Sequence, residues 1–241
     1  MSAGARETDE PMRTAPRAGS VSAGARGHAD VYEPTRAQRT VARRAAESRA
    51  TIPDLELGAD VDMDRPLSLC EQGSHSLTAV IARACALALR EHPRANAGYR
   101  DGRFELYSRI NIGLLIESGD GLEVATVFDA DTKPLAKLTD VIADLRARVG
   151  SLTRPERSGA TFTLAHHEDT TVAWELPLVW GGQAAAATAG GVREAAVIRA
   201  SEVVAGRLMT ITLACDHRIL YGPQAARFLA RIKELLEHGP L

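Results

Sequence analysis

The sequence has few of the residues on which several common kinds of protein depend. Aromatic side chains make up 4% of its 241 residues, so a stacking surface for bases or sugars is not expected. The 29 Lys and Arg residues nearly balance the 31 Asp and Glu residues, which leaves a net charge of −2. Nucleic-acid binders and binders of anionic membranes need a basic face, so this balance argues against both classes.

Cysteines and long apolar runs are also scarce. The three cysteines, Cys70, Cys85 and Cys215, form no CxxC pair, which argues against a disulfide framework or a cysteine-based zinc site and indicates a reducing compartment. The longest apolar run, residues 77–89, is interrupted and shorter than the roughly 20 residues that span a bilayer. No apolar N-terminal segment marks a secretory signal. We therefore expect a cytoplasmic protein.

The N-terminal segment differs from the rest of the chain. Residues 1–32 hold almost no large apolar side chain, and the run SAGAR occurs at Ser2–Arg6 and again at Ser22–Arg26. Such a segment buries too little surface to offset the entropy of ordering it, so we predict a disordered tail. Its acidic residues argue against an organellar transit peptide. One domain is then expected over residues 33–241.

This domain alternates between helical and strand patterns, which favours an α/β fold. Thr35 and Ser76 stand where N-caps stand, and Gly119–Gly121 joins two strands as a hairpin turn does. Residues 166–195 are expected to be rich in loops. We expect helices at residues 36–49, 77–91, 134–149 and 223–238, and strands at 51–63, 110–117, 122–128, 160–165 and 208–215.

The most informative segment is ITLACDHRILYG, residues 211–222. An apolar strand delivers Asp216, His217 and Arg218, and a turn and a helix follow. A histidine just past a strand end is held rigidly near solvent, which suits a general base. On this segment alone, a structural histidine bonded to neighbouring backbone is the other interpretation.

Several collinear segments resemble one family, the acyltransferase (E2) catalytic domains of 2-oxoacid dehydrogenase complexes. The family's C-terminal signature, usually DHR-x-x-D-G, resembles DHR-x-x-x-G before AARFLARIKELLE here. The family's opening helix resembles TRAQRTVARRAAESRATIP, and its buried helix resembles LTAVIARACALALREHPRANA. Its paired strands resemble INIGLLIESGDGLEVATVFDADTKPL, and its G-G-T-F-T strand resembles SGATFTLAHHED. The resemblance implies a chloramphenicol-acetyltransferase-like mixed sheet flanked by helices, assembled as a trimer with the active site at the subunit interface.

The resemblance also implies a mechanism. The family's motif histidine is a general base, a role that falls on His217, with Asp216, Arg218 and Gly222 in support. The base takes a proton from a thiol or hydroxyl, which then adds to the thioester carbonyl of an acyl-CoA such as acetyl-CoA. Both substrates meet in one ternary complex, and no acyl-enzyme is formed.

Two positions of the family's motifs have lost their charge. The motif Asp is Tyr221 here, and the Arg of the opening helix with which it is thought to pair is Gln38. A buried Arg without its carboxylate is strongly destabilising, so the loss of both charges is coherent. We expect a Tyr221–Gln38 hydrogen bond in place of the ion pair.

A third departure concerns the family's Ser or Thr that binds the tetrahedral oxyanion, which falls on Ala165. Losing one such hydrogen-bond donor lowers the reaction rate about 10²–10³-fold. Thr163 and His167 share a face with Ala165 if the strand continues, so either is a candidate donor, as is a backbone N–H. Alternatively, Thr163 is an ordinary strand residue and His166–His167 a surface turn. No third metal ligand is suitably spaced from this pair, so no metal is expected.

Three functions remain open at this point. No lipoyl-type domain precedes the catalytic region, which favours a free-standing enzyme that moves an acetyl or similar group from CoA to a small-molecule or carrier-linked hydroxyl. Relatives of that kind act in polyketide tetronate biosynthesis. The alternatives are a dihydrolipoamide acyltransferase of a 2-oxoacid dehydrogenase complex acting in trans, and a catalytically inactive trimeric scaffold. We expect a homotrimer or a multiple of trimers, without nucleic-acid or membrane partners.

Overall fold

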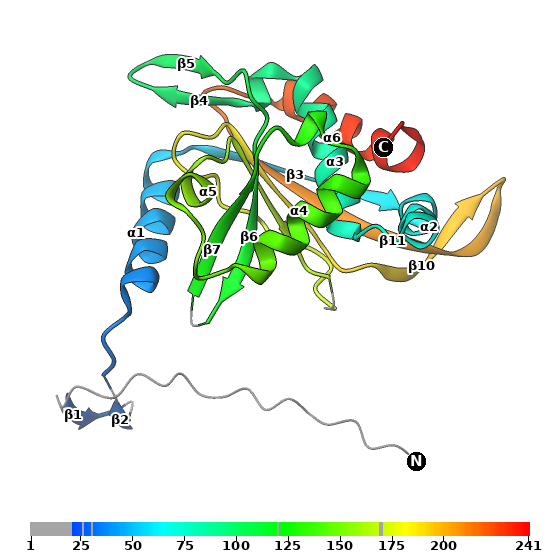
Figure 1. Ribbon diagram of the computed structural model, residues 1–241. Coiled ribbons are helices and arrows are strands. Elements are labelled where there is room, and N and C mark those ends of the chain that lie inside the picture. Colours follow the sequence, from blue (N-terminus) through cyan, green and yellow to red (C-terminus); the bar gives the residue numbers. More distant parts are fainter. Residues whose placement is uncertain (1–20, 26, 30, 120, 169–170) are drawn as a thin grey trace.

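A seven-stranded mixed sheet forms the centre of the protein (Figure 1). The computed structural model describes residues 21–25, 27–29, 31–119, 121–168 and 171–241. The strands run in the order β10-β11-β9-β8-β6-β7, and β3 pairs with β11. Their bounds are β3 Asp54–Asp62, β6 Ile112–Ser118, β7 Gly121–Val127, β8 Phe162–His166, β9 Ala185–Ala189, β10 Arg193–Arg199 and β11 Glu202–Asp216.

Parallel and antiparallel pairs meet at the middle of this sheet. Strand β8 is parallel to both β6 and β9, whereas β11 is antiparallel to β9, β10 and β3. Ala165 of β8 lies opposite Thr188 of β9, which lies opposite Thr212 of β11. This register fixes how far any two residues on β8 and β11 are from each other.

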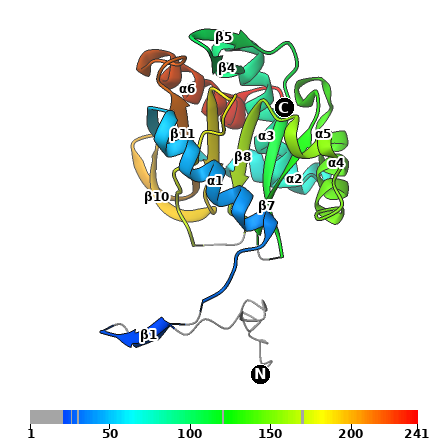
Figure 2. The ribbon, with the colours of Figure 1, turned by 90° about the vertical axis from the view of Figure 1, so that its left-hand side faces the viewer.

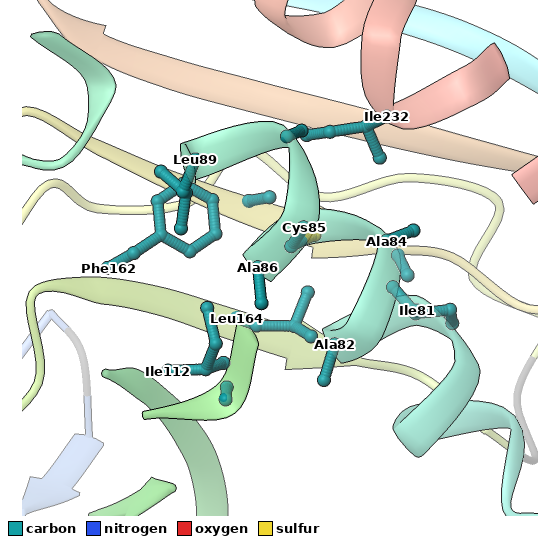
Figure 3. Close-up of a cluster of buried hydrophobic side chains, with 14 of the residues drawn as sticks. Ile81, Ala82, Ala84, Cys85, Ala86, Leu89, Ile112, Phe162, Leu164 and Ile232 are labelled. Atoms are coloured by element: carbon teal, nitrogen blue, oxygen red, sulfur yellow. The ribbon is translucent and has the colours of Figure 1, made fainter. Parts of the chain in front are cut away.

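Helices cover both faces of the sheet. Helix α3 (Leu77–Glu91) packs on one face, where its side chains point toward Phe162 and Leu164 of β8 and toward Ile232 of α6 (Figure 3). The opposite face carries α1, which lies across the front of the sheet in the view of Figure 2. The other helices are α1 Arg36–Thr51, α2 Asp64–Gly73, α4 Leu135–Ala147, α5 Arg154–Ser158 and α6 Gly222–His238, with short 3-10 turns at Pro93–Ala95 and Ala130–Thr132.

The core follows from the alternation of side chains along β8. Phe162 and Leu164 point to the α3 face and are buried at 0% and 1% exposure, and Phe162 meets Phe228 of α6 edge to face. Thr163 and Ala165 consequently point to the opposite face. Helix α3 is buried along most of its length, as its apolar sequence predicts.

The predicted helices and strands are present, and six helices and strands in the described part of residues 33–241 were not predicted. These are α2, α5, the hairpin of β4 (Ala97–Arg100) and β5 (Arg103–Leu106), strand β9 inside the stretch expected to be loops, and strand β10, which begins within that stretch. Strand β9 reads AAATA, and alanine has little strand propensity. It forms because all five residues are buried between β8 and β11.

The predicted disordered tail, residues 1–32, lies mostly outside the described residues. Within it, β1 (Val21–Gly24) and β2 (Gly27–Ala29) pair as a small antiparallel hairpin, which differs from the expectation. Gly27 has a φ of +79°, a value that glycine adopts without strain at such a turn. Across the described residues, no helix is both long and apolar enough to cross a membrane.

Candidate active site

The turn after β11 holds the DHR motif in a fixed conformation. The carboxylate of Asp216, which is 1% exposed, accepts hydrogen bonds from the Arg218 main-chain N–H at 3.0 Å, Nε at 2.9 Å and Nη2 at 2.7 Å. The pKa of Arg218 is raised by this hydrogen bonding. Its guanidinium lies 4.4 Å from the centre of the Tyr99 ring, a cation–π contact that holds the other side of the ion pair.

His217, between these two residues, presents its side chain to solvent. Its main-chain N–H donates to the carbonyl of Pro53 at 2.9 Å, which ties the turn to the end of α1. Its ring lies edge to face with Tyr221 at 5.8 Å between ring centres. Within the described part of the chain, neither ring nitrogen has a hydrogen-bond partner. The imidazole is therefore oriented by packing while its nitrogens stay available to a substrate.

The structure does not bring Tyr221 and Gln38 together, so the predicted hydrogen bond between them is wrong. Gln38 forms a capping box with Thr35: its side chain accepts from the Thr35 N–H at 2.8 Å, and the Thr35 hydroxyl accepts from the Gln38 N–H at 3.2 Å. About 20 Å of helix separates Gln38 from Thr51, the end of α1 that lies near His217. The spacing T-x-x-Q is itself a capping-box signal.

Tyr221 and Gly222 begin helix α6. The Tyr221 ring is 45% exposed and faces both the His217 ring and the Arg94 guanidinium, the latter at 5.9 Å. Tyr221 thus neighbours His217 through its ring rather than through an ion pair. At Gly222 a Cβ would meet only Leu55 at an ordinary 3.9 Å, so the chain gives no steric reason for glycine there.

The face of β8 opposite the core carries the three residues predicted around the oxyanion position. Ala165 is 9% exposed and has no polar side-chain atom. Thr163 is buried, and its hydroxyl donates to Gln183 Oε1 at 2.8 Å. The His167 N–H donates to the Ala189 carbonyl at 2.9 Å, which continues the ladder one residue past β8. The predicted common face of Thr163, Ala165 and His167 follows from this continuation.

His217 and Ala165 are far apart within one chain. Ala165 is level with Thr212 of β11, which lies five residues before His217, the residue that follows the strand. At about 3.3 Å per residue and about 4.8 Å per strand, the two residues are about 19 Å apart. A substrate carbonyl in contact with His217 therefore cannot reach Ala165 of the same chain.

Two of the cavities on the Ala165 face of the sheet are lined by residues predicted for the site. One, of about 390 Å³, lies between α1 and β8 and is lined by Thr163, Trp180 and the arginines Arg43, Arg44 and Arg157. The Arg44 guanidinium lies 5.8 Å from the centre of the Trp180 ring. The other, of about 610 Å³, is lined by Ala165 and His167 among others. Arg43 pairs with Glu47, which also lines this cavity, at 2.7 Å, and Arg157 pairs with Glu123 at 3.3 Å. Arg44 has no carboxylate partner among the described residues, so its charge is the one that suits an anionic substrate.

A polar cluster beside the second cavity was not predicted. His166 Nδ1 lies 3.0 Å from the Thr78 hydroxyl of α3, and Arg146 Nη2 lies 2.5 Å from a Glu168 carboxylate oxygen. Hydrogen bonds from His166, Arg146 and Thr78 hold the pKa of Glu168 far below its usual range. His167 Nε2 lies 2.5 Å from Glu175 Oε2. Glu175 lies in an irregular segment, so no sequence period signals this partner.

Among the described residues, no group of three or more His, Cys, Asp or Glu side chains is arranged to hold a metal ion. The His166–His167 pair splits between the two faces of β8, since His166 contacts α3 and His167 contacts Glu175. Adjacent residues of a strand point to opposite faces, so the two rings do not form a joint ligand pair.

This arrangement, a mixed sheet with helices on both faces and an exposed histidine at a strand end, defines a chloramphenicol-acetyltransferase-like protein. Residues 27–240 match the 2-oxoacid dehydrogenases acyltransferase (catalytic domain) family, and the chain belongs to that family. A solved dihydrolipoamide acetyltransferase from Azotobacter vinelandii is 21% identical, with a TM-score of 0.84 over 93% of this chain and 98% of that one. A chloramphenicol acetyltransferase has a TM-score of 0.54 at 16% identity over 81% of this chain and 94% of that one.

A relative known by its sequence is the dihydrolipoyllysine-residue acetyltransferase component of the pyruvate dehydrogenase complex from Acholeplasma laidlawii. It is 27% identical over 228 residues, which are 89% of this chain and 42% of the relative. The chain thus spans less than half the length of this relative.

Proposed function

We propose that this chain is an E2-type acyltransferase that moves an acyl group between CoA and a thiol or hydroxyl, with His217 as the general base. The observation that carries the proposal is the exposed His217 ring, fixed between the Asp216–Arg218 ion pair and Tyr221 with both nitrogens available. A base needs this combination of fixed position and open nitrogen to take a proton from an acceptor.

The spacing of residues in a solved relative supports this assignment. A serine, a histidine and an asparagine of the Azotobacter enzyme are named for roles in its catalytic mechanism, the serine 52 positions before the histidine and the asparagine four positions after it. In this chain the same spacings from His217 lead to Ala165 and Tyr221. The base is kept, and both other positions differ.

The separation of His217 from Ala165 supports a site shared between two copies of the chain. About 19 Å lies between them within one chain, by the sheet spacings given above. His217 of one copy and the Ala165 face of a neighbour can meet if the copies form a ring. A head-to-tail contact that closes after three copies gives the trimer that the resemblance implies.

The arginine-lined cavity supports CoA as the acyl donor. Arg43, Arg44 and Arg157 line it on the Ala165 face, together with Thr163 of β8. CoA carries several phosphate charges, and arginine binds phosphate through paired N–H groups. A donor held there approaches Ala165 along the same face of the sheet.

The relatives favour a dihydrolipoyl group as the acceptor over a small-molecule hydroxyl of a polyketide pathway, because they are dihydrolipoyllysine-residue acetyltransferases. The extent of the given sequence does not decide between them, since these relatives match the chain over part of their own length. A hydroxyl acceptor remains the second candidate. It is favoured by Ala165 and Tyr221, which stand at the positions of the named serine and asparagine of the Azotobacter enzyme.

In the proposed reaction, the neutral His217 ring takes the proton of the acceptor S–H or O–H. The acceptor sulfur or oxygen adds to the thioester carbonyl carbon, and the carbonyl oxygen becomes an oxyanion. Collapse of this intermediate restores the carbonyl and breaks the bond to the CoA sulfur. The CoA thiolate then takes the proton from His217, which regenerates the base.

The test is release of free CoA from acetyl-CoA, with dihydrolipoamide in one assay and a panel of primary alcohols in another. We expect turnover with dihydrolipoamide, and its loss in His217→Ala. His238→Gln, an exposed histidine at the end of α6, is the matched control and should keep the activity. Turnover with alcohols alone would select the second candidate. Absence of both turnover and CoA binding would leave a scaffold and overturn the proposal.

A further inference from the structure

Ala165 leaves an acyltransferase site without the side-chain hydroxyl found at the matching position of the Azotobacter enzyme. Removing one hydrogen-bond donor to the oxyanion lowers the rate about 10²–10³-fold. If the proposed function holds, another donor must therefore take the place of the hydroxyl. The cavity of about 610 Å³ beside Ala165 shows which side chains are available. Its walls include His166, His167 and Glu175.

His167 is the ring on the correct face. Its N–H bond to the Ala189 carbonyl extends the β8–β9 ladder, so its side chain leaves the strand on the side of Ala165, two residues away. Two residues of strand span about 7 Å, so a substrate oxygen can lie between the methyl group of Ala165 and the ring. The ring is 29% exposed and accessible to such a substrate.

Glu175 fixes the orientation of this ring. Its Oε2 lies 2.5 Å from His167 Nε2, and among the described residues Nδ1 has no hydrogen-bond partner. The Glu175 carbonyl in turn accepts a hydrogen bond from the Thr212 hydroxyl of β11. The main chain of Glu175 is therefore tied to the sheet, and its carboxylate pairs with the ring through Nε2, with Nδ1–H as the donor offered to a substrate.

The segment that carries Glu175 is itself packed closely on the sheet. The Gly191 N–H donates to the Val172 carbonyl at 2.9 Å. At Gly190 a Cβ would lie 2.0 Å from the Ala173 carbonyl oxygen, a distance that no side chain tolerates. Glycine at position 190 thus permits the close approach that sets Glu175 beside His167.

The other candidates are already engaged elsewhere. The Thr163 hydroxyl, 3% exposed, donates to Gln183 at 2.8 Å. His166 leaves β8 on the opposite face, where its Nδ1 meets Thr78 of α3. Besides Glu175, the charged and titratable side chains of the described residues that line the cavity with His167 are His166, Glu117, Glu168 and Arg146, of which Glu168 and Arg146 pair with each other.

We propose that His167, oriented by Glu175, takes the place of the missing hydroxyl and donates a hydrogen bond to the oxyanion beside Ala165. The proposal rests on the proposed function. When the acceptor adds to the thioester and its proton passes to the neighbour's base, the carbonyl electron pair moves to oxygen, and His167 binds that oxygen. His167 keeps its own proton throughout, and the bond to the oxygen weakens when CoA leaves.

The experiment measures kcat and KM for CoA release from acetyl-CoA with dihydrolipoamide in the whole protein. We expect His167→Ala to lower kcat about 100-fold with KM little changed, because the lost bond exists only in the transition state. Glu175→Gln should lower kcat by less. The double variant Ala165→Ser, His167→Ala should recover most of the loss, since a hydroxyl then stands at position 165.

A conservative variant supplies a second readout. His167→Gln, whose amide N–H also donates a hydrogen bond, should keep more of the native kcat than His167→Ala. His238→Gln should behave as the native protein.

The outcomes separate the two proposals. If the native protein turns over and His167→Ala stays within threefold of it, the His167 assignment is overturned and the proposed function stands. A loss that Ala165→Ser does not restore would assign His167 a structural role, which also overturns the assignment. If the native protein releases no CoA with any acceptor, the proposed function fails first, and this inference fails with it.

Discussion

Two inactive variants should restore each other's activity if the site is shared between copies of the chain. His217→Ala removes the proposed base and leaves the Ala165 face intact. Ala165→Phe places a bulky ring on that face and leaves the proposed base intact. The sheet register places the two positions about 19 Å apart within one chain. One substitution therefore does not disturb the other region of the same chain.

The expected magnitude follows from how mixed rings assemble. At equal amounts of the two variants, an active interface needs the base from one variant and the open face from the other. About one interface in four meets both conditions in a randomly mixed ring, so about a quarter of the native rate is expected. Each variant alone should be close to inactive.

The assay is CoA release after the two variants are unfolded together and refolded, with native mass spectrometry to establish that mixed oligomers have formed. A control sample contains the variants refolded separately and then combined, which should stay inactive while the rings do not exchange. Mixed oligomers without activity would refute the reasoning, because the site would then lie within one chain. A monomer in solution would refute it as well.

The remaining predictions concern stability. Gly190→Ala should lower the free energy of unfolding by about 1–3 kcal/mol and lower the melting temperature, because its Cβ meets the Ala173 carbonyl, whereas Gly181→Ala, with open space around it, should not. The hydrogen bond from Arg148 lowers the pKa of Glu156 from its usual 4.5 to about 2. Its folded-state pKa lies below the unfolded value, so its stabilisation is present above pH 4.5 and is lost toward pH 2. Thermal melts of Glu156→Gln should therefore depend less on pH in that range than those of the native protein.

The sequence predicted those parts of the fold that carry a local signal. Ser76 before LTAVIARACALALRE gave the bounds of α3, and the Gly119–Gly121 turn gave the hairpin of β6 and β7. Strand β9 has no such signal, because its alanines form a strand only when β8 and β11 lie on either side. The strand forms through contacts between residues that are distant in the sequence, and the strand propensity of its own residues carries no information about those contacts.

In the candidate site, too, features with a local sequence signal could be predicted, and features that depend on distant contacts could not. The strand-to-helix turn around His217 could be predicted, since an apolar strand, a charged triplet and a helix follow each other directly. The Tyr221–Gln38 bond was predicted from a family pairing and failed because the local capping box of α1 uses Gln38. Glu175 could not be predicted, because its place beside His167 depends on the packing of an irregular segment on Gly190.

Aromatic side chains orient His217, the proposed base, without the expected ion pair. Aromatic residues are only 4% of the sequence, yet two tyrosines lie beside the DHR turn. Tyr99 packs against the Arg218 guanidinium at 4.4 Å, and Tyr221 packs against the His217 ring at 5.8 Å. An edge-to-face ring contact contributes about 0.5–1.5 kcal/mol and requires no buried charge. The loss of the motif carboxylate at position 221 is therefore compatible with a positioned base, since ring packing constrains His217 from one side and the Asp216–Arg218 pair fixes the turn from the other.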